Sequence, residues 1–157
     1  MLRWFMPVKI LIVEDNEFKR QRIFEVFTND NHSLSVDECY SFTSAWKLIS
    51  EGGYDLVILD MSLPTFDKSQ SEPGGAFRVF GGKELARKMA KRGIDSKFIF
   101  VTQYKNFSDN ISSYSFDSLK TELSKNYEGS CLGFIFYSNT QSDWKEELLL
   151  AVNMVAK

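Results

Sequence analysis

The sequence contains few of the residues from which many familiar sites are built. Among 157 residues there are one histidine, two cysteines and three prolines. The cysteines, Cys39 and Cys131, form no CxxC pair, and the histidine, His32, lies in a polar stretch at residues 29–32. These counts exclude zinc ribbons, metal sites with two histidines, and nucleophile pairs that need a second histidine. We interpret His32 as a solvated loop residue, and cysteine usage of this kind as typical of a reducing compartment.

The chain also has neither a strong charge imbalance nor a long apolar run. Its 19 basic and 21 acidic side chains leave a formal net charge of −2, which gives no electrostatic basis for nucleic acid or an anionic membrane as the main partner. The apolar runs have the length of strands, well short of the roughly 20 residues that a membrane-spanning helix needs. Residues 1–6 lack the long apolar core and cleavage site of a signal peptide. We therefore expect a cytoplasmic protein with no nucleic-acid or membrane partner.

The overall composition is that of a globular protein. Hydrophobic residues make up 43% of the chain and charged residues 25%. A chain of this length should bury roughly 70% of its unfolded surface, so it needs no disulfide or metal to fold. No linker, internal repeat or low-complexity segment divides it. We expect residues 1–157 to form a single domain.

Five short apolar runs alternate with segments of helical periodicity. Four runs are continuous, as in parallel strands that are covered on both faces, and the second alternates apolar and polar residues like a half-buried edge strand. The runs occupy residues 9–13, 33–37, 55–60, 97–102 and 133–137. In the first helical segment, the expected core face is made of Phe18, Ile23, Phe24 and Phe27. This alternation predicts an open parallel sheet with helices on both faces.

Two connections, residues 63–81 and 103–115, are longer than the usual 2–6 residues. Each is either a functional loop or a tolerated surface insertion. The first ends in an apolar group made of Phe77, Val79 and Phe80. We expect this group to pack down, because leaving such side chains exposed costs roughly 1.5–3 kcal/mol each. We expect the polar residues 67–73 before it to stay mobile.

Polar side chains stand where three of the predicted strands end. Glu14 and Asp15 follow the first strand, Asp60 ends the third and Thr102 ends the fourth. Ligands of open parallel sheets bind at this edge. Neighbouring carboxylates raise one another's pKa unless a cation is present, and an oxygen-rich cluster without histidine suits Mg²⁺. The alternative is that these carboxylates are solvated, with Asp15 capping the first helix.

The same segments resemble the receiver domains of two-component response regulators. The resemblance is carried by ILIVEDN at residues 10–16, YDLVILDMSLP at 54–64 and FIFVT at 98–102. It implies a flavodoxin-like (βα)5 α/β fold, doubly wound, with a parallel sheet of strand order 2-1-3-4-5. The core would span about residues 8–157, with an enlarged loop at 63–81 that either lies over the site as a lid or presents a partner-binding surface.

The resemblance also implies roles for the acidic residues. Asp60 resembles the phospho-acceptor, a carboxylate that takes a phosphoryl group from a phosphohistidine partner. Asp15 resembles the direct Mg²⁺ ligand, and Glu14 a ligand that acts through water. Asp60 itself and the backbone carbonyl of Ser62 would complete the metal site. Magnesium makes physical sense there, because an anionic phosphoryl group must approach a group of carboxylates.

Other family positions match only in part. Thr102 resembles the hydroxyl that contacts the phosphoryl group, and Phe134 falls at the aromatic switch position, where an ordinary core phenylalanine is the alternative. The family's lysine at the end of the fifth strand is Tyr137 here, which brings no positive charge and predicts slow or undetectable phosphorylation by small donors. Gln103 stands where a small residue is usual and is a candidate to cover the acceptor. Lys105 is either a substitute cation or, as we prefer, a solvated side chain.

The leading hypothesis is a stand-alone receiver domain in phosphorelay signalling, with no enzymatic turnover beyond self-phosphorylation and dephosphorylation. Its expected partners are a sensor histidine kinase or phosphotransfer protein and a downstream effector protein. The fourth helix, fifth strand and fifth helix are the expected output surface and a candidate homodimer interface. One alternative is a pseudo-receiver that binds proteins without phosphorylation. Another is a metal-dependent phosphatase or phosphotransferase, against which Ser62 stands where such enzymes commonly carry a second acid.

Overall fold

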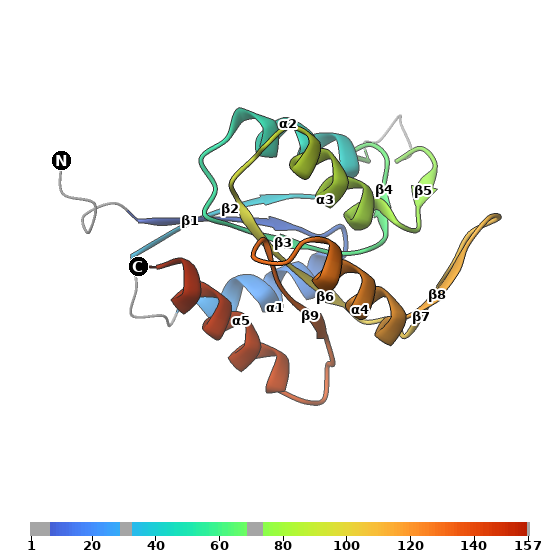
Figure 1. The fold of residues 1–157 in the computed structure, drawn as a ribbon. Coiled ribbons are helices and arrows are strands. Elements are labelled where there is room, and N and C mark those ends of the chain that lie inside the picture. Colours follow the sequence, from blue (N-terminus) through green and yellow to red (C-terminus); the bar gives the residue numbers. More distant parts are fainter. Residues whose placement is uncertain (1–6, 29–32, 69–73, 157) are drawn as a thin grey trace.

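Five parallel strands form the central sheet of the computed structural model, which describes residues 7–28, 33–68 and 74–156 (Figure 1). Their order across the sheet is β2-β1-β3-β6-β9. Numbered along the chain as core strands, this is the order 2-1-3-4-5, which confirms the predicted topology. The strands are β1 (Val8–Val13), β2 (Leu34–Cys39), β3 (Leu56–Leu59), β6 (Lys97–Thr102) and β9 (Cys131–Phe136).

Helices cover both faces of the sheet in the described part of the chain (Figure 1). α1 (Glu17–Thr28) and α5 (Asp143–Val155) pack on one face, and α2 (Phe42–Glu51), α3 (Gly81–Lys91) and α4 (Phe116–Asn126) pack on the other. Successive residues of the central strands enter the two cores in turn, which explains why these strands are apolar throughout. No helix in the described ranges has the length and apolar character needed to cross a membrane.

Side-chain caps begin the helices that follow the first two strands. The side chain of Asn16 accepts a hydrogen bond from the Lys19 backbone N–H at 2.9 Å, which caps α1. The capping alternative for Asp15 is therefore wrong, because its neighbour takes that role. Ser41 and Ser44 form a reciprocal capping box at the start of α2. These caps fix where the chain leaves the carboxyl ends of β1 and β2.

Both long connections contain a small antiparallel hairpin that the sequence did not predict. In the first, β4 (Leu63–Pro64) pairs with β5 (Phe77–Arg78). In the second, β7 (Asn106–Ser108) pairs with β8 (Ser113–Ser115), and this hairpin projects from the body of the molecule (Figure 1). Phe107 of β7 is buried and anchors the base of the projecting hairpin. In its described part, each connection therefore forms a small two-stranded sheet of its own, separate from the central sheet.

The apolar group at the end of the first connection packs down only in part. Val79 and Phe80 pack against the core, and the Phe80 ring meets the Tyr114 ring edge-on at 5.5 Å. Phe77 is 57% exposed, so the expectation that it would be buried is wrong. Its place in the two-residue strand β5 holds its side chain outward instead. The expected mobility of residues 67–73 lies largely outside the described residues.

Candidate functional site

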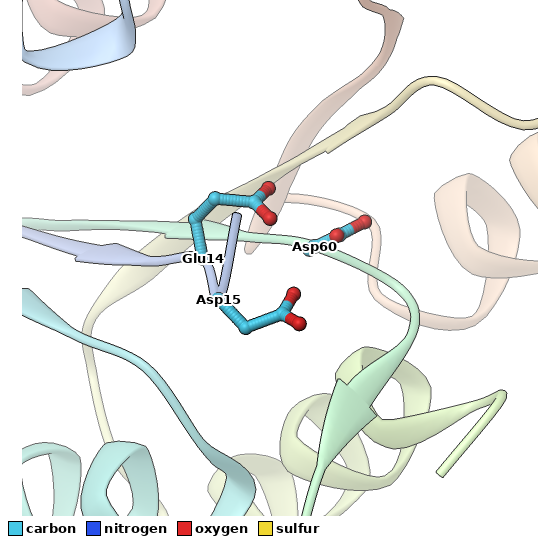
Figure 2. A group of neighbouring side chains, drawn as sticks. All are labelled: Glu14, Asp15 and Asp60. Carbon is cyan, nitrogen blue, oxygen red and sulfur yellow. The ribbon is translucent and has the colours of Figure 1, made fainter. Parts of the chain in front are cut away.

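Neighbouring strands bring three carboxylates together at the carboxyl edge of the sheet. Glu14 and Asp15 directly follow β1, Asp60 directly follows β3, and the two strands are paired. One carboxylate oxygen from each residue lies within 4.8 Å of the others (Figure 2). Glu14 and Asp60 are buried, whereas Asp15 is half-buried and faces the rim. The structure thus assembles the acidic cluster that the strand ends predict.

Hydrogen bonds and an ion pair fix the carboxylate of Asp60. The Asp60 backbone N–H donates to the Val13 carbonyl at 3.1 Å, which continues the pairing of the two strands. Its Oδ1 accepts the Met61 N–H at 2.8 Å, and its Oδ2 lies 3.5 Å from Lys19 Nζ. The residue is 3% exposed. The side chain is therefore held in one orientation below the surface.

Burial and mutual repulsion raise the pKa of each acid in the cluster. Burial is the main cause for Asp60, with the charge of Lys19 opposing it. Burial and the charge of Asp60 raise the pKa of Glu14 to about 7, again against the effect of Lys19. Burial and the neighbouring Glu14 raise the pKa of Asp15. A divalent cation that oxygen ligands bind, such as Mg²⁺, would relieve this repulsion, so the donor set fits the metal.

The raised pKa of Glu14 predicts a loss of stability with rising pH in the metal-free protein. A carboxyl whose pKa is higher in the folded state binds more protons there, so its contribution is full below the unfolded value of 4.5 and is lost as the pH rises through about 7. We expect this to lower the free energy of unfolding by up to about 3 kcal/mol. Urea unfolding in EDTA from pH 5 to pH 8 measures the effect. The Glu14→Gln variant should show a flatter profile; parallel profiles would contradict the assignment.

The site also contains a buried cation that the sequence analysis missed. Lys19 of α1 is 2% exposed, and its Nζ lies 2.6 Å from Glu14 Oε1. The ammonium donates to the Val101 carbonyl at 2.9 Å and to Gln103 Oε1 at 2.7 Å. Burial alone would lower the pKa of this lysine, but the charges of Asp60 and Glu14 outweigh burial and raise it. Lys19 is therefore a charged group in the acidic cluster.

The position of Lys19 follows from the rotation of α1. The buried residues of this helix are Lys19, Ile23 and Phe27, which are spaced four apart and so share one face. Hydrophobic spacing predicted a core face that begins at Phe18, but Phe18 is 61% exposed. This assignment of Phe18 is wrong. Ile23 and Phe27 are four residues apart, and the same step toward the N-terminus leads to Lys19. This spacing is the sequence signal that would have predicted the burial of Lys19.

Three residues that were expected near the phosphoryl position each contact a different group: Thr102, Gln103 and Lys105. Thr102 is buried at the end of β6, and its hydroxyl accepts the Tyr104 N–H at 3.2 Å. The side chain of Gln103 contacts Lys19 through the hydrogen bond given above. Lys105 Nζ lies 5.0 Å from the ring centre of Phe136. Lys105 therefore contacts an aromatic ring here, which agrees with the interpretation that it is not the substitute cation.

Tyr137, which replaces the family's lysine, does not direct its hydroxyl to a carboxylate. That hydroxyl donates to Asn139 Oδ1 at 2.8 Å. Its ring packs at 4.8 Å from the ring of Trp144 and lies 5.7 Å from Lys19 Nζ. Tyr137 thus forms part of the wall beside the buried lysine.

Two further predicted positions lie in packed surroundings. The Ser62 hydroxyl donates to the Val79 carbonyl at 2.8 Å, which ties the chain after β3 to the enlarged connection. Phe134 is buried, with ring centres at 5.2 Å from Phe100 and 4.8 Å from Phe116. This packing is that of a core phenylalanine, and a switch role for Phe134 stays a prediction.

A glycine of α3 permits close approach to the backbone of Asp60. The Gly82 N–H donates to the Met61 carbonyl at 2.8 Å, and a Cβ added at Gly82 would clash with the Asp60 carbonyl oxygen. We expect Gly82→Ala to lower the free energy of unfolding by about 1–3 kcal/mol, because α3 or the strand end must shift. The matched control is Gly81→Ala, whose added Cβ would meet side-chain atoms at 3.3 Å or more. Urea unfolding compares the two, and equal midpoints would contradict the prediction.

Comparison with known proteins identifies the family. The profile of the response regulator receiver domain matches residues 10–128. The Detocs response regulatory protein DtcB of Enterobacter cloacae (strain JD6301) is 31% identical over 145 residues, which cover 90% of this chain and 96% of that protein. The chain therefore belongs to the response regulator receiver domains of two-component signalling, as the resemblance implied.

Solved structures show the same fold. One is the response regulator TrrA of Thermotoga maritima in complex with Mg²⁺ and BeF, with a TM-score of 0.60, 24% identity and coverage of 96% of this chain and 99% of that one. Another is the phosphorylated cyanobacterial phytochrome response regulator RcpA, with a TM-score of 0.64, 18% identity and coverage of 96% and 94%. The flavodoxin-like receiver fold is confirmed.

Proposed function

We propose that the chain is a phospho-accepting receiver in which Asp60 takes a phosphoryl group from a phosphohistidine on a sensor kinase or phosphotransfer protein. The observation that carries this proposal is the acidic cluster. Three carboxylates from the paired ends of β1 and β3 lie within 4.8 Å of one another in a receiver fold. The pKa values of all three acids are raised even with Lys19 beside two of them, and a bound divalent cation would relieve the remaining repulsion.

The chemistry follows from the carboxylate of Asp60. One of its oxygens attacks phosphorus, an O–P bond forms, the N–P bond of phosphohistidine breaks, and the imidazole leaves with the electron pair. Asp15, Asp60 and the Ser62 carbonyl are the proposed Mg²⁺ ligands, with Glu14 acting through water. The chemistry that Mg²⁺ supplies when bound is neutralisation of the charges of the cluster and the phosphoryl group. Thr102 is the proposed hydroxyl partner of a phosphoryl oxygen.

The signal would pass to a downstream effector protein by contact, since receivers act through the surfaces that they present. The proposed output surface consists of α4, β9 and α5, which is also the candidate homodimer interface. In support, β9 exposes Phe136, and α5 exposes Leu150 and Met154. Leu150 and Met154 are four residues apart, so they share one face of α5 that a protein partner would cover.

A pseudo-receiver is the second candidate function, and one observation favours it. The acceptor carboxylate is almost fully buried, and the strand-end lysine of the family is replaced by Tyr137. A chain of this kind would keep the fold and bind partners without phosphorylation. Incubation with acetyl phosphate and Mg²⁺, followed by intact mass measurement, separates the two functions. Addition of one phosphoryl group supports the receiver, and an unchanged mass supports the pseudo-receiver.

A further inference from the structure

We propose that Lys19 of α1 supplies the cation that binds the phosphoryl group on Asp60, in place of the lysine that Tyr137 replaces. This inference rests on the proposed function of Asp60. It assigns the role to a different element of the fold, since the family's lysine comes from the end of the last strand and Lys19 comes from the first helix. Neither the sequence motifs nor the matched family positions assign a function to Lys19.

The contacts of Lys19 place its ammonium among the acceptor's own charges. Nζ lies 3.5 Å from Asp60 Oδ2 and 2.6 Å from Glu14 Oε1, and both carboxylates are buried. Removing a lysine from water is costly unless anions or hydrogen bonds compensate it. In this protein, the anions that compensate the buried Lys19 ammonium are the carboxylates of Glu14 and of Asp60, the proposed acceptor. An ammonium in this place lies within reach of an oxygen added to Asp60.

The hydrogen bonds of Lys19 allow an exchange of partners on phosphorylation. An ammonium has three donors, and Glu14, the Val101 carbonyl and Gln103 Oε1 are its nearest acceptors. The amide oxygen of Gln103 is neutral, so a phosphoryl oxygen with a negative charge is the stronger acceptor. A cavity of about 200 Å³, lined in part by Lys19, Gln103 and Tyr137, leaves room for the side chains to shift. Gln103 therefore accepts a hydrogen bond from Lys19 in the unphosphorylated protein, and a phosphoryl oxygen takes the place of Gln103 after phosphorylation.

The surroundings of Tyr137 explain how Lys19 can take the role of the lysine that the family has at this position. Its ring lies 5.7 Å from Lys19 Nζ, so the side chain at the family's lysine position and the side chain of Lys19 converge on one space. Two ammonium groups buried there would repel each other. A neutral aromatic residue at position 137 instead packs beside the stem and head of the lysine. The tyrosine is thus compatible with a phospho-accepting site.

The charge of Lys19 should have opposite effects on the two ligands of the site. It repels Mg²⁺ and attracts a phosphoryl group, so its removal should strengthen metal binding and weaken binding of a phosphoryl mimic. A purely structural lysine, which only ties α1 to Val101 and Gln103, would not produce this opposition. The probes are therefore Mg²⁺ alone and beryllofluoride in the presence of saturating Mg²⁺.

Calorimetry on the full chain tests the inference with Lys19→Met, and with the exposed Lys105→Met as the matched control. We expect Lys19→Met to bind beryllofluoride at least ~10-fold more weakly, as for the loss of a hydrogen bond between charged groups. Its Mg²⁺ affinity should be equal or higher. The Lys105→Met variant should match the wild type. Unchanged beryllofluoride affinity in Lys19→Met would overturn the inference and leave the function of Asp60 standing.

Two further measurements extend the test, and the second uses only the wild type, so it does not depend on the folding of Lys19→Met. The double variant Lys19→Met/Tyr137→Lys returns a cation to the family's position and should regain beryllofluoride affinity. In the wild type, the Nζ resonance of buried Lys19 should shift when beryllofluoride is added to the Mg²⁺ complex, and an unmoved resonance would refute a contact. Failure of the wild type to bind beryllofluoride at all would overturn the proposed function of Asp60, and this inference with it.

Discussion

The Asp60→Asn variant is expected to take up no phosphoryl group under conditions in which the wild-type chain takes up one. An amide has the shape of the carboxylate but lacks its nucleophilic anion, so the O–P bond cannot form. Incubation with acetyl phosphate and Mg²⁺, followed by intact mass measurement at a series of times, gives both the stoichiometry and the rate. Glu25→Gln, which removes an exposed carboxylate from α1, is the matched control and should label like the wild type.

The outcomes of this experiment separate three interpretations of the site. Labelling that persists in Asp60→Asn would place the acceptor elsewhere. Labelling absent from both proteins would support the pseudo-receiver. The rate is also informative, because the absence of a strand-end lysine predicted slow labelling, whereas Lys19 supplies a positive charge at the same carboxylate. With the charge present, the burial of Asp60 is the remaining physical reason for slow transfer.

Much of the fold was predictable because it depends on patterns that are local in the sequence. Three of the continuous apolar runs correspond to the central strands β1, β3 and β6, which are buried on both faces, and the alternating run at residues 33–37 overlaps β2 at the sheet edge. The continuous run at residues 133–137 overlaps β9, and the expectation that it would be covered on both faces is wrong, because β9 is the other edge strand and exposes Phe136. The polar residues Glu14, Asp15 and Asp60 stand directly after such runs. Parallel strands bring their carboxyl ends to one edge, so the sequence predicts the cluster without knowledge of side-chain geometry.

What the sequence did not predict depends on rotation and on contacts between distant residues. Phe18 and Lys19 are adjacent, and hydrophobicity alone assigns the phenylalanine to the core. The structure exposes Phe18 and buries Lys19, because acceptors from Glu14, Val101 and Gln103 compensate the ammonium. Those acceptors come from different parts of the chain, and no local pattern contains them. The predicted core face of α1 was therefore wrong by one residue, from Phe18 to Lys19, and this error removed the buried cation from the predicted site.

The two small hairpins escaped prediction for a related reason. Strands β4 and β5 have two residues each, and β7 and β8 have three, which is too short for a periodic pattern to be recognised. The β4–β5 hairpin lies between β3 and α3, and the β7–β8 hairpin lies between β6 and α4. The pairing of these short strands therefore depends on where the flanking core elements end and begin. The Ser62 hydroxyl bonds to the Val79 carbonyl, and the Phe116 N–H bonds to the Lys105 carbonyl at 2.7 Å. The first bond connects the chain next to β5 with a residue two positions after Asp60, and the second joins the two residues that flank the β7–β8 hairpin.

The Asp15→Ala variant is expected to lose Mg²⁺ binding altogether. Of the three carboxylates, Glu14 is engaged by Lys19 and by the Asn16 N–H at 3.1 Å, and Asp60 is engaged by Met61 and Lys19. Asp15 is half-buried at the rim, so its oxygens are the most accessible to an ion that enters from solvent. Without it, the remaining acids offer too few free oxygens for a cation that demands near-octahedral coordination.

Calorimetry and thermal unfolding with and without Mg²⁺ measure this loss. At an ion concentration of about one hundred times the dissociation constant, binding should stabilise the wild type by about 2.7 kcal/mol, and Asp15→Ala should gain nothing. Glu25→Gln, again the control, should respond like the wild type. Protons compete for the same oxygens, and the pKa of Glu14 is about 7, so the wild-type gain should shrink as the pH falls below that value. Equal Mg²⁺ affinity in the wild type and Asp15→Ala would mean that the acidic cluster is not the metal site.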